Sequence, residues 1–255
     1  MLNAIHRAML SNRYTRRLQR QMLLSLKNRL GYSDPYADLA DAVGKGSPDA
    51  VLDIGSHVGK TISRILDFST LGSTPVHGFE PTPEAFDLLH KAYGEHPQVT
   101  LHQIALSDQT TMQVMHRNQN GQTNSLLENG IGNQTELPDA TAELGQFEVQ
   151  SVRLDDWYAE KLGKGKIIIK CDVQGAEGQL IQGGESTFEN HVLAFLSEAQ
   201  IAPMYEGQAT FDELHQTLTR KFDFSLANIY PCFRSPGGRA LQTDALWLRN
   251  DLFHA

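Results

Sequence analysis

The stretch Ala50–Thr61, AVLDIGSHVGKT, constrains the fold of this chain more than any other. Its apolar run Ala50–Ile54 is typical of a buried strand, and Gly55 and Gly59 punctuate the residues that follow. This order predicts a strand, then a glycine turn, then a helix. In open α/β sheets ligands bind beyond the carboxyl ends of the strands, so the turn from Asp53 to Gly59 is predicted to contact a cofactor.

The spacing within this turn favours a cationic cofactor over a dinucleotide. Dinucleotide-binding turns carry G-x-G-x-x-G, in which the second glycine lets the backbone approach the pyrophosphate, and here His57 stands at that position. The Asp53 carboxylate would repel a pyrophosphate at short range but attract the ammonium and sulfonium groups of S-adenosylmethionine. A nicotinamide-dependent oxidoreductase is therefore disfavoured. The residues predicted to bind S-adenosylmethionine are Asp53, Gly55, Ser56, His57 and Gly59.

Glu80 is a second acidic residue in a position suited to this cofactor. The segment Val76–Pro81, VHGFEP, is predicted to be another short strand, and it ends in Glu80, 27 residues after Asp53. An acidic residue at the end of the second strand can accept hydrogen bonds from both ribose hydroxyls of an adenosine. We therefore predict that Glu80 and Pro81 bind the cofactor. The alternative is that Asp53 and Glu80 only cap the helices that follow them.

A third strand is predicted over Val99–Leu106, with Ala105 at its end. A small apolar side chain at this point can form a wall for an adenine ring. Ala105 is therefore predicted to bind the cofactor, although a close-packed alanine fits the same pattern.

The residues from 116 to 146 are rich in Asn, Gln, Gly and Thr. Long segments of this kind inside a domain are usually binding loops, lids or disordered. We expect a mobile insertion whose amides suit a hydroxyl-rich small-molecule or glycan acceptor. The alternative is a solvated loop without a role.

The segment Lys166–Gly175, KIIIKCDVQG, brings a further carboxylate to the same place. Its β-branched run is typical of a central parallel strand, and Asp172 falls at the carboxyl end. Glu198 follows the next buried strand, so two carboxylates would end neighbouring strands about 4.8 Å apart. Such a pair can share a proton or bind a divalent ion such as Mg²⁺. The alternative is that backbone N–H groups or a basic residue such as Lys170 bind Glu198, and no metal site is assigned.

The last two strands are predicted over Phe224–Tyr230 and Thr243–Arg249. The loop between them is too short for a helical crossover, so they should form an antiparallel hairpin. We predict an α/β fold with a Rossmann-like, seven-stranded, mostly parallel sheet, helices on both faces, and this hairpin at the C-terminus. The domain is placed at residues 48–255.

Bulk properties limit the class of protein. The 255 residues carry a net charge of -8, which argues against nucleic acid as a partner. No apolar run approaches the roughly 20 residues that span a bilayer, so no stable membrane insertion is expected. The two cysteines lack a C-x-x-C spacing. This cysteine usage predicts a reduced, cytoplasmic location.

The N-terminal residues 1–47 form a predicted basic helical arm. Met1–Ser33 holds seven Lys or Arg residues and no acidic residue, and its apolar residues recur at helical spacing. Such a helix can pack on the sheet edge or on a second subunit, which would make a homo-oligomer. The alternatives are adhesion to an anionic membrane and recognition of an acidic substrate.

Several stretches together resemble the FkbM family of S-adenosylmethionine-dependent methyltransferases, which have the Class I, Rossmann-like fold. They are VLDIGSHVGKT around Asp53, FEPTPEAFDLL from Phe79, IALSD from Ile104, KCDVQGAEGQLIQGG from Lys170 and the terminal DALWLR. The family typically shows D-x-G-A-N-x-G in the first stretch, where this chain has Ser56 and His57. It favours I-D-V-E-G in the fourth, where this chain has Cys171 and Gln174.

The resemblance implies methyl transfer from S-adenosylmethionine to a hydroxyl of a sugar or natural product. Transfer from a sulfonium is an in-line displacement in which positioning supplies much of the rate, and the hydroxyl also has to lose its proton. Asp172 is predicted to be the catalytic residue that orients or deprotonates it, and also to contact the cofactor. The alternative is that Asp172 only holds the cofactor or caps a helix. The departures at Ser56, His57 and Gln174 keep a second interpretation, a non-catalytic adenosyl-binding regulatory domain.

Overall fold

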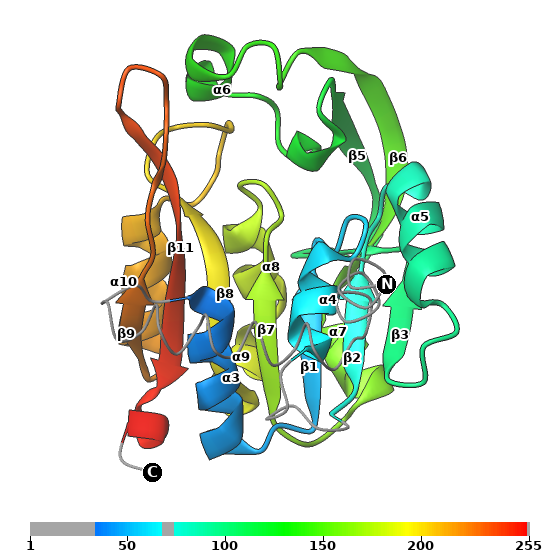
Figure 1. The fold of residues 1–255 in the computed structure, drawn as a ribbon, viewed down its shortest axis with the longest axis vertical. Helices are drawn as coiled ribbons and strands as arrows, with labels where there is room; N and C mark the ends of the chain where they lie inside the picture. Colours follow the sequence, from blue (N-terminus) through cyan, green and yellow to red (C-terminus); the bar gives the residue numbers. More distant parts are fainter. Residues whose placement is uncertain (1–33, 68–73, 254–255) are drawn as a thin grey trace, which may run out of the picture.

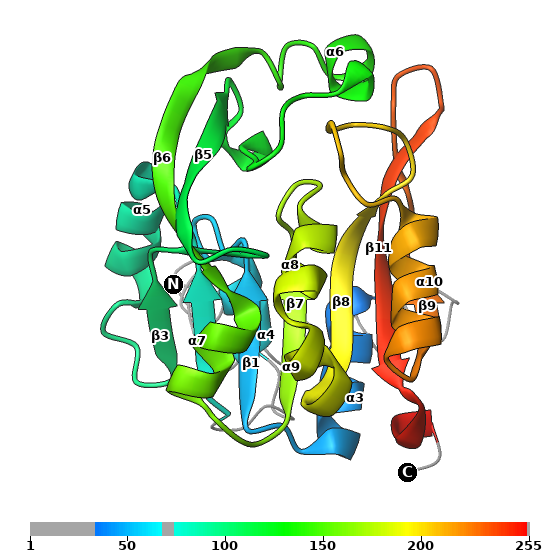
Figure 2. The same ribbon diagram turned by 180° about the vertical axis from the view of Figure 1, so that it is seen from behind.

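The computed structural model describes residues 34–67 and 74–253 and shows a central sheet with helices on both faces (Figures 1 and 2). The strands of this sheet are β1 (Ala50–Ile54), β2 (Val76–Phe79), β3 (Val99–His102), β7 (Ile167–Cys171), β8 (Val192–Gln200), β9 (Phe224–Ile229), β10 (Phe233–Arg234) and β11 (Ala240–Arg249). They follow the order β10-β11-β8-β7-β1-β2-β3, and β9 also pairs with β11. The central pairs are parallel, whereas β11 runs antiparallel to β8, β9 and β10.

Helices cover both faces because the central strands are apolar on both sides. In β1, Ala50, Leu52 and Ile54 face one hydrophobic cluster and Val51 faces the other. Parallel strands that are buried on both faces have this continuous apolar sequence rather than an alternation.

The two helical layers differ in the segments that form them. One layer contains α3 (Pro35–Gly46), α4 (Lys60–Leu66) and α5 (Pro83–Tyr93). The other contains α7 (Leu154–Lys161), α8 (Glu177–Gly183), α9 (Glu185–Asn190) and α10 (Phe211–Lys221). The sheet therefore lies between a layer from the first part of the chain and a layer from the second.

The register of the parallel strands places three chain segments level with one another. Ile54, the last residue of β1, pairs with Phe79 at the end of β2 and with Cys171 at the end of β7. The residues that follow these strands therefore leave the sheet at one edge. That edge carries the candidate site.

A second, three-stranded sheet stands above this edge (Figures 1 and 2). Its strands are β4 (Ala105–Ser107), β5 (Thr111–Asn118) and β6 (Glu143–Arg153), in the order β4-β6-β5. The prediction of one strand over Val99–Leu106 is wrong. β3 pairs with β2 and β4 with β6, so the chain changes sheets after His102, and an apolar pattern cannot reveal such a change.

The polar insertion contains more regular structure than its composition predicts. Its ends belong to β5 and β6, and between them lie η2 (Gly121–Thr123) and α6 (Ile131–Glu136). Side-chain hydrogen bonds supplement the apolar contacts of Leu126, Leu127 and Leu137 here. Asn118 donates to Thr123 O at 2.6 Å, and Asn129 donates to Asn118 Oδ1 at 2.8 Å. These amides bond to one another and to the backbone. The same polar residues that predicted a loop therefore stabilise regular structure in this segment.

The predicted α/β fold class is confirmed, with a mostly parallel sheet and a final antiparallel hairpin of β9 and β11. Within the described residues the main sheet has eight strands, not seven, because the two-residue β10 lies in the predicted loop and pairs with β11. β8 also extends past Glu198 to Gln200.

The N-terminal arm is described only in its last part. Leu39 and Ala42 of α3 are buried in the same cluster as β8 and β11, so residues 34–47 pack on the sheet. The basic residues 1–33 lie outside the described residues, and the division at residue 47 stays a prediction. Within the described ranges, none of the helices has the length and apolar character that crossing a bilayer requires.

Candidate active site

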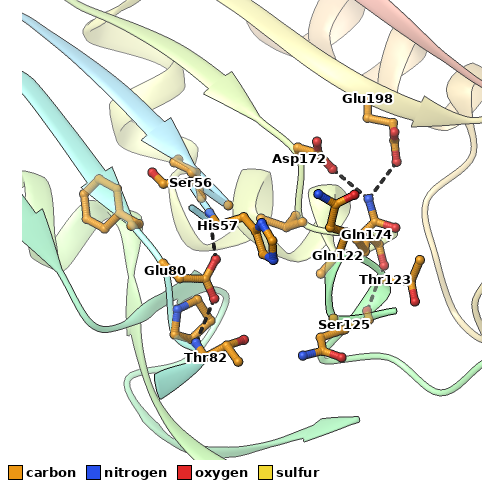
Figure 3. A pocket seen from close by; sticks show the side chains of 18 of the residues that line it. Ser56, His57, Glu80, Thr82, Gln122, Thr123, Ser125, Asp172, Gln174 and Glu198 are labelled. Carbon is orange, nitrogen blue, oxygen red and sulfur yellow. Dashed lines mark hydrogen bonds between the residues drawn. The ribbon is translucent and has the colours of Figure 1, made fainter. Parts of the chain in front are cut away.

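A cavity of about 630 Å³ opens at the edge where β1, β2 and β7 end. Its floor consists of the residues that follow these strands, and part of its wall comes from β4. Residues 120–126 of the insertion, here called the roof, line the opposite side. Figure 3 shows side chains from floor and roof pointing into the same space. Of the predicted site residues, those that line it are Gly55, Ser56, His57, Glu80, Pro81, Ala105 and Asp172.

Gly55 is required where β1 and β7 approach each other. Its φ is 84°, and a Cβ added there would lie 1.9 Å from the backbone carbonyl oxygen of Asp172. The Asp172 N–H in turn donates to Ile54 O at 2.9 Å. The glycine is therefore explained by this close backbone approach, so it does not by itself indicate a cofactor.

Glu80 is held rigidly at the cavity wall (Figure 3). His57 N–H donates to its Oε2 at 2.9 Å and Thr82 N–H donates to its Oε1 at 2.8 Å. Burial raises the pKa of Glu80, and these backbone donors oppose the rise. Each carboxylate oxygen can accept further hydrogen bonds, so Glu80 retains acceptor capacity at the cavity wall.

His57 takes a left-handed backbone conformation, with φ 47°. That conformation points its N–H at Glu80. Its imidazole lies in the cavity, between Glu80 and the roof residue Gln122 (Figure 3). The N–H bond to Glu80 adds to the two backbone hydrogen bonds, from Gly55 N–H and Ser56 N–H to Phe79 O, that join the β1 turn to the end of β2.

Asp53 and Gly59 do not line the cavity. Asp53 is fully buried, and among the described residues its carboxylate oxygens have no hydrogen-bond partner. Burial raises its pKa to about 6, against the opposing charge of Lys170. Gly59 has φ 84°, and a Cβ there would lie 2.4 Å from the Tyr93 ring. The predicted cofactor contacts of Asp53 and Gly59 stay predictions. The close approach of Tyr93 explains by itself why position 59 is a glycine.

The cavity wall opposite Asp172 is apolar. It is formed by Phe79 and Pro81 at the end of β2 and by Ile104, Ala105 and Leu106 at β4. A flat, weakly polar group such as an adenine ring suits this surface. Glu80 lies next to it, where a ribose attached to such a ring would follow.

Asp172 is held through both carboxylate oxygens. Lys170 Nζ donates to Oδ2 at 3.1 Å, and Gln174 Nε2 donates to Oδ1 at 2.7 Å. Burial alone would lower the pKa of Lys170, but the surrounding carboxylates, Asp172 first, raise it above its ordinary value. Lys170 is therefore a permanent cation, and Asp172 is about one-third exposed toward the cavity.

Glu198 lies beside Asp172 and is bound by amides rather than by Lys170. Gln174 Nε2 and Gln200 Nε2 each donate to Oε1 at 3.0 Å, and Gln242 Nε2 donates to Oε2. Burial, and then the neighbouring Asp172 carboxylate, raise the pKa of Glu198 well above its usual range. The expected meeting of two carboxylates is present, but Lys170 contacts Asp172.

Several residues of this site were not predicted as site residues. Thr82, Tyr205, Gln242 and the roof residue Gln122 line the cavity. Thr82 follows the FEP motif closely enough to have been found from it. The others lie far along the chain, and their approach depends on β8, β11 and the second sheet. Within the described ranges, no group of three or more His, Cys, Asp or Glu side chains could hold a metal ion.

The residues present fit S-adenosylmethionine. The apolar wall and Glu80 match an adenosine, and the buried, unpartnered Asp53 carboxylate leaves negative charge beneath the turn. Glu80, His57 and the wall at Ala105 would hold the adenosine, and Asp172 would lie toward the acceptor.

Comparison with known proteins identifies the family. Residues 53–226 match the family described as "Methyltransferase FkbM domain". The chain belongs to the FkbM methyltransferase family. The S-adenosylmethionine-dependent methyltransferase activity predicted for it follows from this membership.

Individual relatives of this FkbM methyltransferase are distant. The "2-O-methyltransferase NoeI" of Sinorhizobium fredii is 28% identical over 210 residues, which cover 76% of this chain and 84% of the relative. A solved FkbM methyltransferase from Methylobacillus flagellatus is 13% identical to this chain, with a TM-score of 0.48. The match covers 80% of this chain and 44% of the solved one. Aeropyrum pernix fibrillarin, solved with natively bound S-adenosyl-L-methionine, has 11% identity and a TM-score of 0.45, over 80% of this chain and 68% of that chain.

The departures from the FkbM pattern preserve the backbone. His57 replaces an Asn of the pattern, and both residue types are enriched in the left-handed conformation that this position adopts. Gln174, with φ 57°, is also left-handed. The substitutions therefore change side-chain chemistry in the cavity without requiring a different turn.

The buried carboxyl of Glu177 should make the stability of this FkbM methyltransferase depend on pH. It is fully buried behind Asp172, accepts from Val173 N–H at 3.1 Å, and its Oε2 has no hydrogen-bond partner among the described residues. Burial raises its pKa to about 7. A raised acid pKa stabilises the fold at low pH, and this contribution is lost as pH rises from about 4.5 to about 7.

Glu177→Gln removes that titration, so its free energy of unfolding relative to wild type should increase by roughly 1–3 kcal/mol across this pH range. Urea unfolding at several pH values measures the difference. Glu95→Gln, at an exposed position, is the control and should give a curve parallel to wild type. A Glu177→Gln curve that is also parallel to wild type would show that the carboxyl does not titrate in the folded state as described.

Proposed function

We propose that this FkbM methyltransferase methylates a hydroxyl group of a sugar or of a hydroxylated natural product. The observation that carries the proposal is Asp172, a carboxylate with both oxygens held in place and one side open to the cavity. A fixed carboxylate next to a cofactor site suits removal of a hydroxyl proton. The relative named as a 2-O-methyltransferase supports oxygen as the acceptor atom.

The chain's contribution divides between two halves of the cavity. Glu80, with acceptor capacity left on both oxygens, is suited to the ribose hydroxyls, and the wall at Ala105 to the adenine. S-adenosylmethionine supplies a methyl group on a positively charged sulfur. Asp172 orients the acceptor hydroxyl and takes its proton, while the surrounding protein restricts the approach of water.

Besides Asp172 and Glu198, neutral polar side chains line the half of the cavity that is proposed for the acceptor. Asn120, Gln122 and Asn124 of the roof contribute amides, and Gln242 and the half-exposed Phe233 lie opposite. A side-chain amide can both donate a hydrogen bond to a hydroxyl and accept one from it. An aromatic face can pack on the apolar face of a sugar ring. This composition supports an uncharged, hydroxyl-rich acceptor.

The cofactor assignment is tested by Glu80→Ala. Loss of hydrogen bonds from two hydroxyls to a carboxylate should weaken S-adenosylhomocysteine binding by roughly 1.5–3 kcal/mol. Isothermal titration calorimetry measures the dissociation constant. Glu84→Ala, which removes an exposed carboxylate on α5, is the matched control and should bind normally. A folded Glu80→Ala protein with an unchanged constant would remove Glu80 from the cofactor site.

The reaction is tested by transfer of a radiolabelled methyl group from S-adenosylmethionine to a panel of sugars and glycosides. Asp172→Asn should lower kcat by about 10²–10⁴-fold because the acceptor's proton has no base. The KM for S-adenosylmethionine should change little. Asp156→Asn, on the exposed surface of α7, is the control.

Three results would contradict the reaction as proposed. Full activity of Asp172→Asn would exclude it as the base. Cofactor binding without transfer to any acceptor would favour a non-catalytic adenosyl-binding domain. The same assay after EDTA treatment, with Mg²⁺ added back, tests the alternative that Asp172 and Glu198 bind a divalent ion. Activity that requires Mg²⁺ would contradict a reaction in which Asp172 acts alone, and would give Glu198 a metal-binding role.

A further inference from the structure

We propose that Gln174 is a positioning residue for the methyl transfer, because its side-chain amide separates the Asp172 and Glu198 carboxylates and fixes the orientation of Asp172. This proposal rests on the proposed function, because it assumes that Asp172 is the base. The family pattern has an acidic residue at this position, so the bridge by a neutral amide is a property of this chain's own residue.

The amide nitrogen of Gln174 contacts both carboxylates. Nε2 donates to Asp172 Oδ1 at 2.7 Å and to Glu198 Oε1 at 3.0 Å (Figure 3). A primary amide has two N–H donors, so each carboxylate receives one. The two acids are therefore joined through a neutral group instead of through a shared proton.

The orientation of this amide is set by contacts on its other side. Tyr205 O–H donates to Gln174 Oε1 at 2.8 Å, and a flipped amide would lose this bond and turn its oxygen toward two carboxylates. Burial raises the pKa of Tyr205 above its ordinary value, so the phenol stays protonated as a donor. Ser125 Oγ of the roof donates to the Gln174 carbonyl oxygen at 2.7 Å, which holds the left-handed backbone.

The surrounding charges make the bridge necessary. The titratable groups that interact with Asp172 are Lys170 and Cys171 on β7, Asp53 on β1, Glu177 on α8, Glu198 on β8, Asp244 on β11 and Tyr205 after β8. Tyr36 of α3 lies near Lys170, and Arg64 of α4 near Asp244.

Lys170 is the one buried Lys or Arg side chain in the described part of the chain, and it faces several acids. Gln174 gives each of the two neighbouring acids one N–H donor, and hydrogen bonds to the charged form favour ionisation. A proton on Asp172 would occupy the lone pair that the acceptor hydroxyl needs.

Gln174→Ala and Gln174→Glu test the bridge. In Gln174→Ala each acid loses one N–H donor, so the acid limb of the kcat–pH profile should move to higher pH by about one unit, and kcat at pH values on that limb should fall by up to roughly tenfold. Gln174→Glu adds a third carboxyl and should move the limb further. The KM for S-adenosylmethionine should stay within about twofold, because the cofactor half of the cavity is untouched.

Two further variants separate positioning from general damage. Tyr205→Phe keeps both amide donors but releases their orientation, so it should give a smaller shift in the same direction. Gln216→Ala is the matched control, because Gln216 also donates to a carboxylate, Asp212, but on the exposed surface of α10. It should leave both kcat and the pH profile unchanged.

A readout independent of activity is the pH titration of the Asp172 and Glu198 carboxyl carbons by ¹³C NMR. Because each carboxyl loses an N–H donor, both signals should titrate at higher pH in Gln174→Ala than in wild type. If wild type transfers no methyl group, the proposed function fails while this titration still decides the bridge. A folded Gln174→Ala protein, or Gln174→Glu if the alanine variant unfolds, with the wild-type titration and pH profile would overturn the proposal.

Discussion

The contact between the β1 turn and the end of β7 is the constraint on which the rest of the site depends. The Asp172 carbonyl oxygen comes so close to Gly55 that no side chain fits between them. The parallel register brings Ile54 and Cys171 level, and the chain leaves both strands at the same edge. Asp172 therefore lies beside the β1 turn as a consequence of backbone packing.

Acidic side chains dominate the interior of the site, and their arrangement decides what it can do. Glu80 receives backbone donors, Glu198 receives amides, and Asp172 receives one cation and one amide. Each carboxylate thus has a different set of partners. Asp172 is the acid bonded to Lys170 and is also the one proposed to face the acceptor.

The sequence predicts those parts of the site that local pattern determines. The strands ending at Ile54 and Phe79 could be placed, together with Asp53 in the first and Glu80 after the second, because each motif combines an apolar run with a glycine or proline turn. The break after His102 could not, since Val99–Leu106 has the residue pattern of one strand while its two halves pair with different sheets. Tyr205 and Gln242 were inaccessible for a related reason, because only tertiary packing brings them to the cavity.

The most direct test of this account is a crystal structure of the protein with S-adenosylhomocysteine. The account predicts ribose hydroxyls bonded to Glu80, the adenine against Ala105, and the sulfur facing the side of the cavity that holds Asp172. Gln174 should still bridge Asp172 and Glu198 in that complex. Density for the adenosine away from Glu80, or a sulfur that faces away from Asp172, would contradict the assignment of the two halves of the cavity.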